Sequence, residues 1–495
     1  MFDAIVYLIQ PYPLFLLVLG TLLGIIIGAI PGLTGAMLIS LTVPLTFGMN
    51  GVDALVLLVA MYVGSVSGGL LSATLLRMPG TPASIMTTLD GYPLAKSGQP
   101  GRALGLGVAA SAVGGILSWL FLWMLARPMA NLATQLSPFD VFSMVLVALV
   151  LIVSISNQSL LAGLLSGSLG MLSAMPGTSP TGQLRLTAGF AELNDGLKVL
   201  PVLIGLYAIN QIVREIIAPA QQMQTVEMSR RGLFVSFNDL HRHGLNMFRS
   251  SLIGSWIGLL PGIGANIGSV VAYTVAKNRS RAKDAFGNGS EEGIVASEAA
   301  NNATVGGALI PLIALGIPGS VVDAILLGAL MIHNVQPGPL LFKSNPLEVN
   351  CMIATVLAAN VVMVIIMLVL AGQLARLMQV PRALLLPIIL ACCVVGSFAL
   401  GNRGFDVAVM LVFGLVGFLF QAWQIPLAPF VIGFVLAPIA ERKLCEGLML
   451  SGGSYLPLVI EPVSVIFLLV ASIVLVFAIR NRLRPSSIID EPATS

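Results

Sequence analysis

The sequence predicts an all-α protein that crosses a membrane many times. Of its 495 residues, 57% are hydrophobic and only 9% are charged, and the mean hydropathy is +0.98. Soluble proteins carry about 25% charged residues, so a soluble chain of this length could not cover its surface, and lipid must be the solvent for most of it. Apolar runs recur along the whole chain. At about 20 residues for each span, they predict about 11 to 13 transmembrane helices.

The composition also excludes several classes of function. A net charge of +3 is too small to indicate a nucleic-acid partner. The three histidines and four cysteines do not have the spacing of metal ligands, and HExxH, GxSxG and P-loop motifs are absent. We therefore expect no enzyme activity, no catalytic residue, no cofactor, and no metal other than a sodium ion.

Polar interruptions divide the chain into four parts. The longest interruption, 218–249, is rich in arginine and histidine, and basic loops are typical of the cytoplasmic side. We interpret it as a cytoplasmic linker between a first membrane repeat, 1–217, and a second one, 250–480. Residues 481–495 form a tail for which we expect a cytoplasmic location, and we expect no fixed structure for its polar part, 485–495.

Three Pro-Gly landmarks occur in the same order in both halves. Each landmark lies roughly 230 to 240 residues from its counterpart. The pairs are GIIIGAIPG (24–32) with GSWIGLLPG (254–262), RMPGTP (77–82) with LGIPGS (315–320), and QPG (99–101) with QPG (336–338). Because the spacing matches as well as the dipeptides, the sequence predicts an internal repeat.

The charges beside the first landmark predict how the repeats are oriented. The first copy is flanked by MFDAIVYLIQPYP and FGMNGVD, which lack basic residues, whereas the second is flanked by RRGLFVSFNDLHRHGLNMFRS and KNRSRAK. Lys and Arg mark cytoplasmic flanks, so the two copies face opposite sides of the membrane. This pattern indicates inverted-topology repeats. The basic stretch RNRLR (480–484) places the C-terminus in the cytoplasm.

The Pro-Gly pairs of the first two landmarks predict four breaks in the helices, as broken helices or re-entrant hairpins. Proline removes a backbone donor and glycine permits irregular backbone, which the membrane tolerates only beside a polar cavity. A helix that begins after the break directs free N–H groups at it and can hold a carboxylate. The predicted substrate-binding residues are Gly32, Thr34, Gly35, Gly80, Thr81, Ser84, Gly262, Gly264, Asn266, Gly319 and Ser320. For the G-x-x-x-G glycines, close helix packing is the alternative.

Polar side chains inside apolar runs are candidates for binding a coupling cation. An ionisable residue in a span is a functional hypothesis: amide and backbone oxygens suit sodium, and a carboxylate can carry a proton. The candidates are Glu298, Asn301, Asn302 and Asp323. The alternative for Glu298, and for Asp90, is that the carboxylate caps a helix at the membrane interface. Arg77, before the second break, either snorkels or contacts substrate.

At these residues the sequence resembles the large membrane subunit of the tripartite tricarboxylate transporters. The stretches that carry the resemblance are GTLLGIIIGAIPGLTGAM (20–37), MPGTPASIMTTLDGYPLAKSGQPGRALG (78–105), GLLPGIGANIGSVVAY (258–273) and SEAANNATVGGALIPLIALGIPGSVVDAILLGALMIHNVQPGP (297–339). The family often has proline before the glutamate of EAANNA, where this chain has Ser297.

The resemblance implies a function and partners. It implies secondary-active uptake of di- or tricarboxylates such as citrate across the bacterial inner membrane, coupled to sodium or protons. It also implies a small four-helix membrane subunit and a periplasmic solute-binding protein as partners. The alternatives are a permease for another organic anion, such as a sulfonate or an aromatic acid, a membrane-embedded enzyme, and a non-transporting scaffold.

Overall fold

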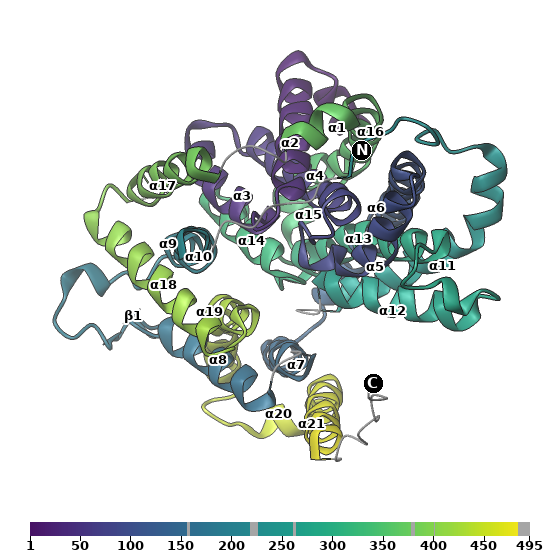
Figure 1. The fold of residues 1–495 in the computed structure, drawn as a ribbon. Helices are drawn as coiled ribbons and strands as arrows, with labels where there is room; N and C mark the ends of the chain where they lie inside the picture. The colour runs from purple at the N-terminus through teal and green to yellow at the C-terminus, as the bar shows by residue number, and fades with distance from the viewer. Residues whose placement is uncertain (156–158, 218–225, 261–263, 378–381, 400, 484–495) are drawn as a thin grey trace, which may run out of the picture.

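The computed structural model describes residues 1–155, 159–217, 226–260, 264–377, 382–399 and 401–483 (Figure 1). These residues form an almost entirely helical protein, which confirms the predicted fold class. The one sheet among them is a short antiparallel ladder of β1 (Gly177–Thr178) and β2 (Leu184–Arg185).

The described residues of the first half form ten α-helices with short turns between them. They are α1 (Phe2–Leu8), α2 (Pro11–Ala29), α3 (Gly35–Thr42), α4 (Gly51–Leu75), α5 (Ile85–Lys96), α6 (Pro100–Ala133), α7 (Pro138–Ile155), α8 (Leu160–Ser173), α9 (Val199–Ile204) and α10 (Asn210–Ile217). The 3-10 turns are η1 (Val43–Gly48), η2 (Pro82–Ser84) and η3 (Ala191–Leu193), and η4 (Gly205–Ile209) is a π-helical turn that joins α9 to α10.

In the second half, the part of the chain that the structure describes forms eleven α-helices. They are α11 (Phe237–Leu259), α12 (Gly264–Arg279), α13 (Glu291–Leu315), α14 (Val321–Ile332), α15 (Leu341–Ser344), α16 (Pro346–Leu377), α17 (Arg382–Ala399), α18 (Gly404–Ala422), α19 (Leu427–Leu450), α20 (Leu456–Ile460) and α21 (Pro462–Leu483), with one 3-10 turn, η5 (Lys283–Ala285). Helix α11 begins inside the region that we interpreted as a linker.

The membrane-spanning character follows from helix length and composition. Among the described residues, seven helices are long and apolar enough to cross a bilayer: α2, α4, α6, the continuous α9–α10 segment, α16, α18 and α21. Shorter apolar helices such as α3 and α14 lie next to the Pro-Gly breaks. The outer face of α21 exposes Ile473, Val476 and Phe477 at more than 60% each, as a lipid-facing helix would.

The glycines of both G-x-x-x-G motifs lie where two helices touch. A methyl group added at Gly24 or Gly28 of α2 would overlap backbone oxygens of α4, and one added at Gly254 of α11 would overlap the carbonyl oxygen of Ala300 on α13. Only glycine allows this approach. The structure therefore shows close packing, the alternative that we kept for these glycines.

Corresponding elements of the two halves make corresponding contacts. Helix α2 packs along α4 as α11 packs along α13, and α16 packs on α4 as α6 packs on α13. Segments η2 and α5 of the first half reach α12 and α13, whereas α14 of the second half reaches α3 and α4. This exchange is what a pair of structural repeats would produce. The opposite membrane orientations, the domain boundaries and the number of crossings stay predictions.

The helices form two groups that meet at α3 and α14. In Figure 1, α7, α8 and α18–α21 lie apart from the group around α4, α6 and α13. Both α3 and α14 follow a Pro-Gly break, and both contact α9, while α14 also contacts α19. The breaks therefore lie close to the border between the two groups.

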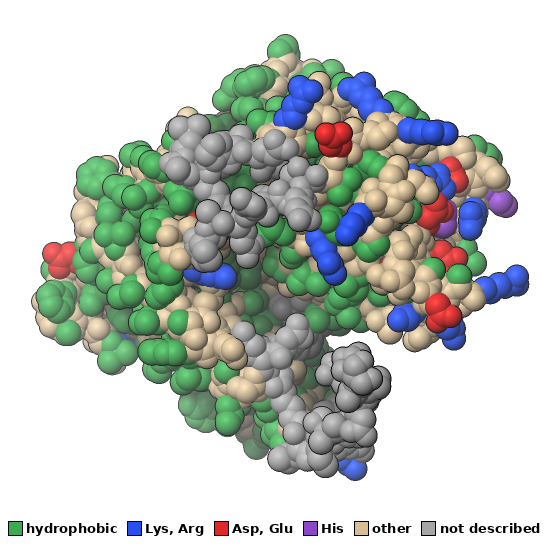
Figure 2. Space-filling view, in the orientation of Figure 1, with side chains coloured by type: hydrophobic (Ala, Val, Ile, Leu, Met, Phe, Trp, Pro, Cys, Tyr) green, Lys and Arg blue, Asp and Glu red, His purple; other side chains and the backbone are tan. Residues whose placement is uncertain are grey.

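Positive side chains gather on one part of the surface. Figure 2 shows Lys and Arg concentrated where α5, α6, α11 and α12 lie in Figure 1, whereas the side around α17 and α18 is mainly hydrophobic. The side chain of Arg102, at the start of α6, bonds both Asp239 of α11 and Glu291 of α13. The positive region thus contains an ion-pair cluster that joins both halves.

Candidate functional site

A cavity of about 600 Å³ lies at the two Pro-Gly breaks of the first half. It is bounded on one side by the break between α2 and α3 and by the break between α4 and η2. The predicted site residues among its described lining are Gly32, Thr34, Gly80 and Thr81. The cavity is large enough for a small organic anion and its water.

At the break after α2, a glycine adopts a left-handed backbone conformation and a threonine caps the next helix. Gly32 has φ +93°, a conformation that favours glycine, and a side chain there would meet Gln211 and Glu215 of α10. Thr34 then caps α3, since its Oγ1 accepts a hydrogen bond from Met37 N at 3.2 Å. Gly35 is the buried first residue of α3, so the helix begins at the cavity wall.

The break after α4 is closed in a similar way. Ser84 Oγ accepts a hydrogen bond from Thr81 N at 3.2 Å and donates one to Thr81 O at 2.8 Å. Ser84 is fully buried and is not part of the described cavity lining. Gly80 lies against the carbonyl oxygen of Gly28. Arg77 lies outside the described lining, with its guanidinium carbon 5.8 Å from the ring centre of Tyr92.

The second-half break residues lie apart from this cavity. Gly319 is buried against Ala308 and Gly258, and Ser320 Oγ lies 3.3 Å from Tyr62 Oη on α4. Gly264 has φ +69° and faces Ser320, whereas Asn266 is exposed on α12. None of these described residues lines the cavity at the first-half breaks. Gly262 lies outside the described residues.

Asp323 is a fully buried carboxylate at the start of α14. Its backbone N–H donates to Ser320 Oγ at 3.3 Å, but neither carboxylate oxygen makes a hydrogen bond of good geometry among the described residues. A buried charge without partners is costly. Asp323 therefore stays a candidate for binding a proton or a cation.

Glu298 and Asn302 belong to a continuous hydrogen-bonded chain. The hydroxyls of Thr87 and Ser111 donate to Glu298 Oε1 and Oε2 at 2.5 and 3.2 Å. Asn302 Nδ2 donates to Ser111 Oγ at 2.8 Å, and its Oδ1 accepts from Ser67 Oγ at 2.6 Å. The chain joins α4, α5, α6 and α13, so two of the four predicted cation residues lie together.

Asn301 points the other way from α13. Its Nδ2 donates to the carbonyl oxygen of Val66 on α4 at 3.4 Å, and its Oδ1 is buried without a hydrogen-bond partner among the described residues. A free amide oxygen is a ligand that sodium accepts. The structure shows no direct bond from Asn301 to the Glu298 chain or to Asp323 within the described part.

Family comparison agrees with this architecture. The family model described as the tripartite tricarboxylate transporter TctA family matches residues 14–432. The chain belongs to this family. A relative from Agrobacterium vitis, an uncharacterized 52.8 kDa protein in the TAR-I ttuC' 3' region, is 31% identical over 466 residues, which cover 94% of this chain and 93% of that protein. A second protein, in the TAR-II ttuC' 3' region, is 32% identical over 231 residues, which cover 47% of this chain and 96% of the relative. No solved structure matches the chain.

Membership identifies the chain as a multi-pass membrane permease of the tricarboxylate transporter type. Four of the six predicted site residues at the first-half breaks line this cavity, but the residues of its far wall are absent from the sequence-based prediction. That wall consists of Tyr207, Asn210, Gln211, Arg214, Glu215 and Gln421. The sequence does indicate most of these wall residues, because NQIVRE (210–215) places polar residues at the end of an apolar run.

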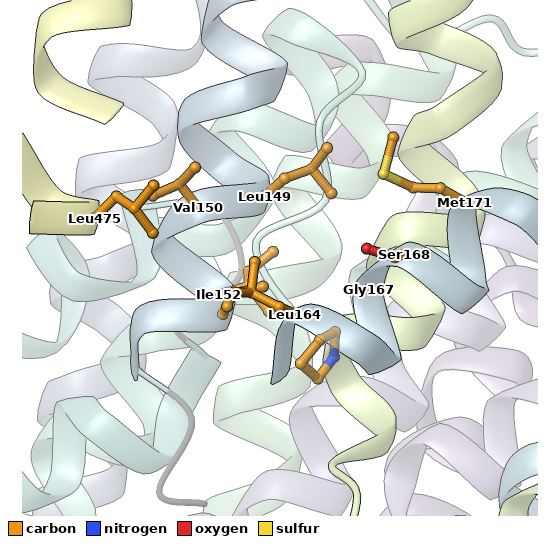
Figure 3. A pocket seen from close by; sticks show the side chains of 10 residues that line it. Leu149, Val150, Ile152, Leu164, Gly167, Ser168, Met171 and Leu475 are labelled. Carbon is orange, nitrogen blue, oxygen red and sulfur yellow. The ribbon is translucent and has the colours of Figure 1, made fainter. Parts of the chain in front are cut away.

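A second cavity has a different character. It measures about 120 Å³ and lies among α7, α8, α19 and α21. Figure 3 shows aliphatic side chains such as Leu149, Val150 and Leu475 around it, and Ser168 is the one described lining residue with a polar side chain. It lacks the groups that would hold an anion.

Proposed function

We propose that this protein is the large permease subunit of a tripartite, binding-protein-dependent symporter that takes up a citrate-like di- or tricarboxylate across the bacterial inner membrane. A periplasmic solute-binding protein would deliver the substrate, and a small four-helix membrane subunit would complete the complex. Family membership supports the transporter class, and the K/R distribution supports a cytoplasmic C-terminus.

The observation that carries the proposal is the cavity at the two first-half breaks. Thr34 and Thr81 border it, and α3 begins at its wall. Helix N-termini offer free N–H groups and a partial positive charge to an anion. An acidic solute held there would be solvated by protein groups instead of water.

Asp323 is the residue that we propose for cation coupling. Its carboxylate is buried and makes no hydrogen bond of good geometry with the described residues, and it follows the Pro318-Gly319 break. Binding of a proton or a sodium ion would neutralise it, and release would restore the costly charge. Occupancy of Asp323 would thereby bias the position of α14, which contacts both helix groups.

Uptake of labelled citrate into proteoliposomes tests the proposal. The permease would be reconstituted with its small subunit and binding protein, and uptake measured with a sodium gradient, a proton gradient or neither. We expect accumulation with one of the gradients. Uptake that stays at the level of empty vesicles for all carboxylates tried would contradict the proposal, and inhibition by sulfonates or aromatic acids instead would favour the alternative substrates.

Two variants connect this uptake to the site. Thr81→Val and Asn301→Ala should abolish uptake while the protein still inserts. The matched controls are Thr274→Val, whose exposed hydroxyl bonds only the carbonyl of Val270 in its own helix, and Asn131→Ala on an exposed position of α6. Normal uptake by Thr81→Val and Asn301→Ala would remove these positions from the site.

A further inference from the structure

One wall of the cavity carries a row of polar side chains on a single helical face. Tyr207, Asn210, Gln211 and Arg214 all line the cavity, and they recur at intervals of three and four residues, which places them on one side of the α9–η4–α10 segment. A π-helical turn occupies Gly205–Ile209, and such turns are frequent at functional sites. The segment is also packed tightly on α18, where a methyl group at Gly205 would overlap the carbonyl oxygen of Met410.

Two polar atoms in this row are left without a partner. Tyr207 Oη and Asn210 Oδ1 are buried and make no hydrogen bond with any described residue. Asn210 Nδ2 donates to Leu206 O at 3.1 Å, so the amide is fixed with its oxygen free. Buried polar groups are normally satisfied. These two atoms beside the cavity are therefore available to a bound solute.

Arg214 is the one Lys or Arg among the described residues that line the cavity. Its side chain is exposed, and Nη1 donates to Gln421 Oε1 of α18 at 2.8 Å. This bond holds one edge of the guanidinium, and its other N–H groups make no side-chain hydrogen bond among the described residues. The neighbouring Glu215 is turned toward Gly32 and accepts a hydrogen bond from Gln211 at 2.8 Å.

We propose that Arg214 is a substrate-binding and specificity-determining residue, which holds the second carboxylate of a di- or tricarboxylate, and that Gln421 positions its guanidinium. This inference rests on the proposed function, in which the break residues hold the first carboxylate. The planar fork of arginine matches a carboxylate through two parallel hydrogen bonds. The neutral groups at the breaks bind one carboxylate of the substrate, and the positive charge of Arg214 at the far wall selects substrates that carry a second carboxylate.

The competing explanation is that Arg214 only anchors its helix at the membrane surface, as many arginines do. The chain offers a matched control for that role. Arg376 also lies in the last turn of a long apolar helix, α16, is exposed, and is absent from the described lining of the cavity. If anchoring is the whole role of Arg214, then neutralising either arginine should have similar consequences.

Binding to the purified full chain, measured by calorimetry, tests the proposal independently of transport. The probes are citrate, succinate and the monocarboxylate butyrate. We expect Arg214→Gln to lower the affinity for citrate and succinate about ten- to a hundredfold and to change the affinity for butyrate by less than about twofold. The affinity of Arg214→Lys for citrate and succinate should lie between those of the wild type and Arg214→Gln. Arg376→Gln should match the wild type for all three acids.

Variants of Gln421 separate positioning from binding. Gln421→Leu should weaken the dicarboxylate several-fold without affecting butyrate. Gln421→Glu should lower the affinity for the dicarboxylate as much as Arg214→Gln does, because the new carboxylate competes with the substrate for the guanidinium of Arg214. Equal effects of Arg214→Gln and Arg376→Gln, or an equal loss for succinate and butyrate, would overturn the proposal. Absence of uptake in proteoliposomes with this binding pattern intact would count against the proposed transport function alone.

Discussion

The hydroxyl of Thr87 lies 2.5 Å from a carboxylate oxygen of Glu298, although the two residues belong to different halves of the chain. Both residues are fully buried. Ser111 donates to the other carboxylate oxygen, so Glu298 depends on donors from α5 and α6 for its solvation. The first and second halves are therefore joined by polar as well as apolar contacts.

Thr87→Val should destabilise the protein by about 1–3 kcal/mol, because it removes a donor from a buried carboxylate. Thr88→Val is the control, since its hydroxyl bonds only Ile85 O in its own helix, and we expect a change within about 0.5 kcal/mol. Thermal unfolding in detergent measures both. Equal shifts for the two variants would show that the Thr87–Glu298 bond contributes nothing specific.

The carboxylate of Asp90 should hold the segment before α13 against α5 through its hydrogen bonds. Its Oδ1 accepts hydrogen bonds from Gly287 N, Gly289 N and Ser290 N, and its Oδ2 accepts one from Tyr273 Oη. In Asp90→Ala, these amides should exchange hydrogen at least about tenfold faster. The control is Asp284→Ala in the exposed turn nearby. Hydrogen exchange is measured by mass spectrometry. Unchanged exchange rates of these amides in Asp90→Ala would contradict this role of Asp90.

The cluster of Arg102, Asp239 and Glu291 predicts a dependence of stability on pH. Hydrogen bonds from Arg102 hold the pKa of the Asp239 carboxyl well below its usual range. A lowered pKa stabilises the fold at neutral pH, and this contribution is lost as the pH falls below about 4 toward the folded pKa. Wild type should thus unfold at a higher temperature than Arg102→Gln at pH 7. This difference in unfolding temperature should become smaller as the pH falls toward 3. A gap that is constant across this range would refute the assignment.

Two glycines of the same helix should respond oppositely to alanine. A methyl group at Gly254 overlaps the backbone of α13, whereas one at Gly244 meets nothing within 4 Å. Gly254→Ala should cost about 1–3 kcal/mol through overpacking, and Gly244→Ala should be neutral or stabilising by about 0.5–1 kcal/mol. Denaturant titrations of the two variants provide the comparison, and similar stabilities would contradict the packing account.

The sequence predicts the breaks well because their causes are local. At the breaks, proline removes a backbone donor and glycine permits irregular backbone, and a small hydroxyl residue after the break caps the next helix, as Thr34 and Ser320 do. Asp90 shows the limit of this reasoning. It was considered as a cap at the membrane interface, yet its carboxylate binds the backbone of the other half, which no local pattern encodes.

The far wall of the cavity could not be predicted for a related reason. Arg214 and Gln421 are neighbours only because α10 and α18 pack together, and helical periodicity carries no information about that pairing. The contact of Gln211 and Glu215 with Gly32 likewise depends on the tertiary fold. The predicted substrate and cation residues stay predictions, although the structure places four of them in one cavity.

Substrate protection of position 81 tests the central claim most directly. Thr81→Cys would be made with the four native cysteines replaced by alanine, and labelled with a small thiol reagent with and without citrate; Thr274→Cys on the exposed face of α12 is the control. If the Pro-Gly breaks form the anion site, citrate should slow labelling at position 81 by more than about tenfold and leave position 274 unchanged. Equal labelling of position 81 with and without citrate, in protein that still transports citrate, would contradict the account.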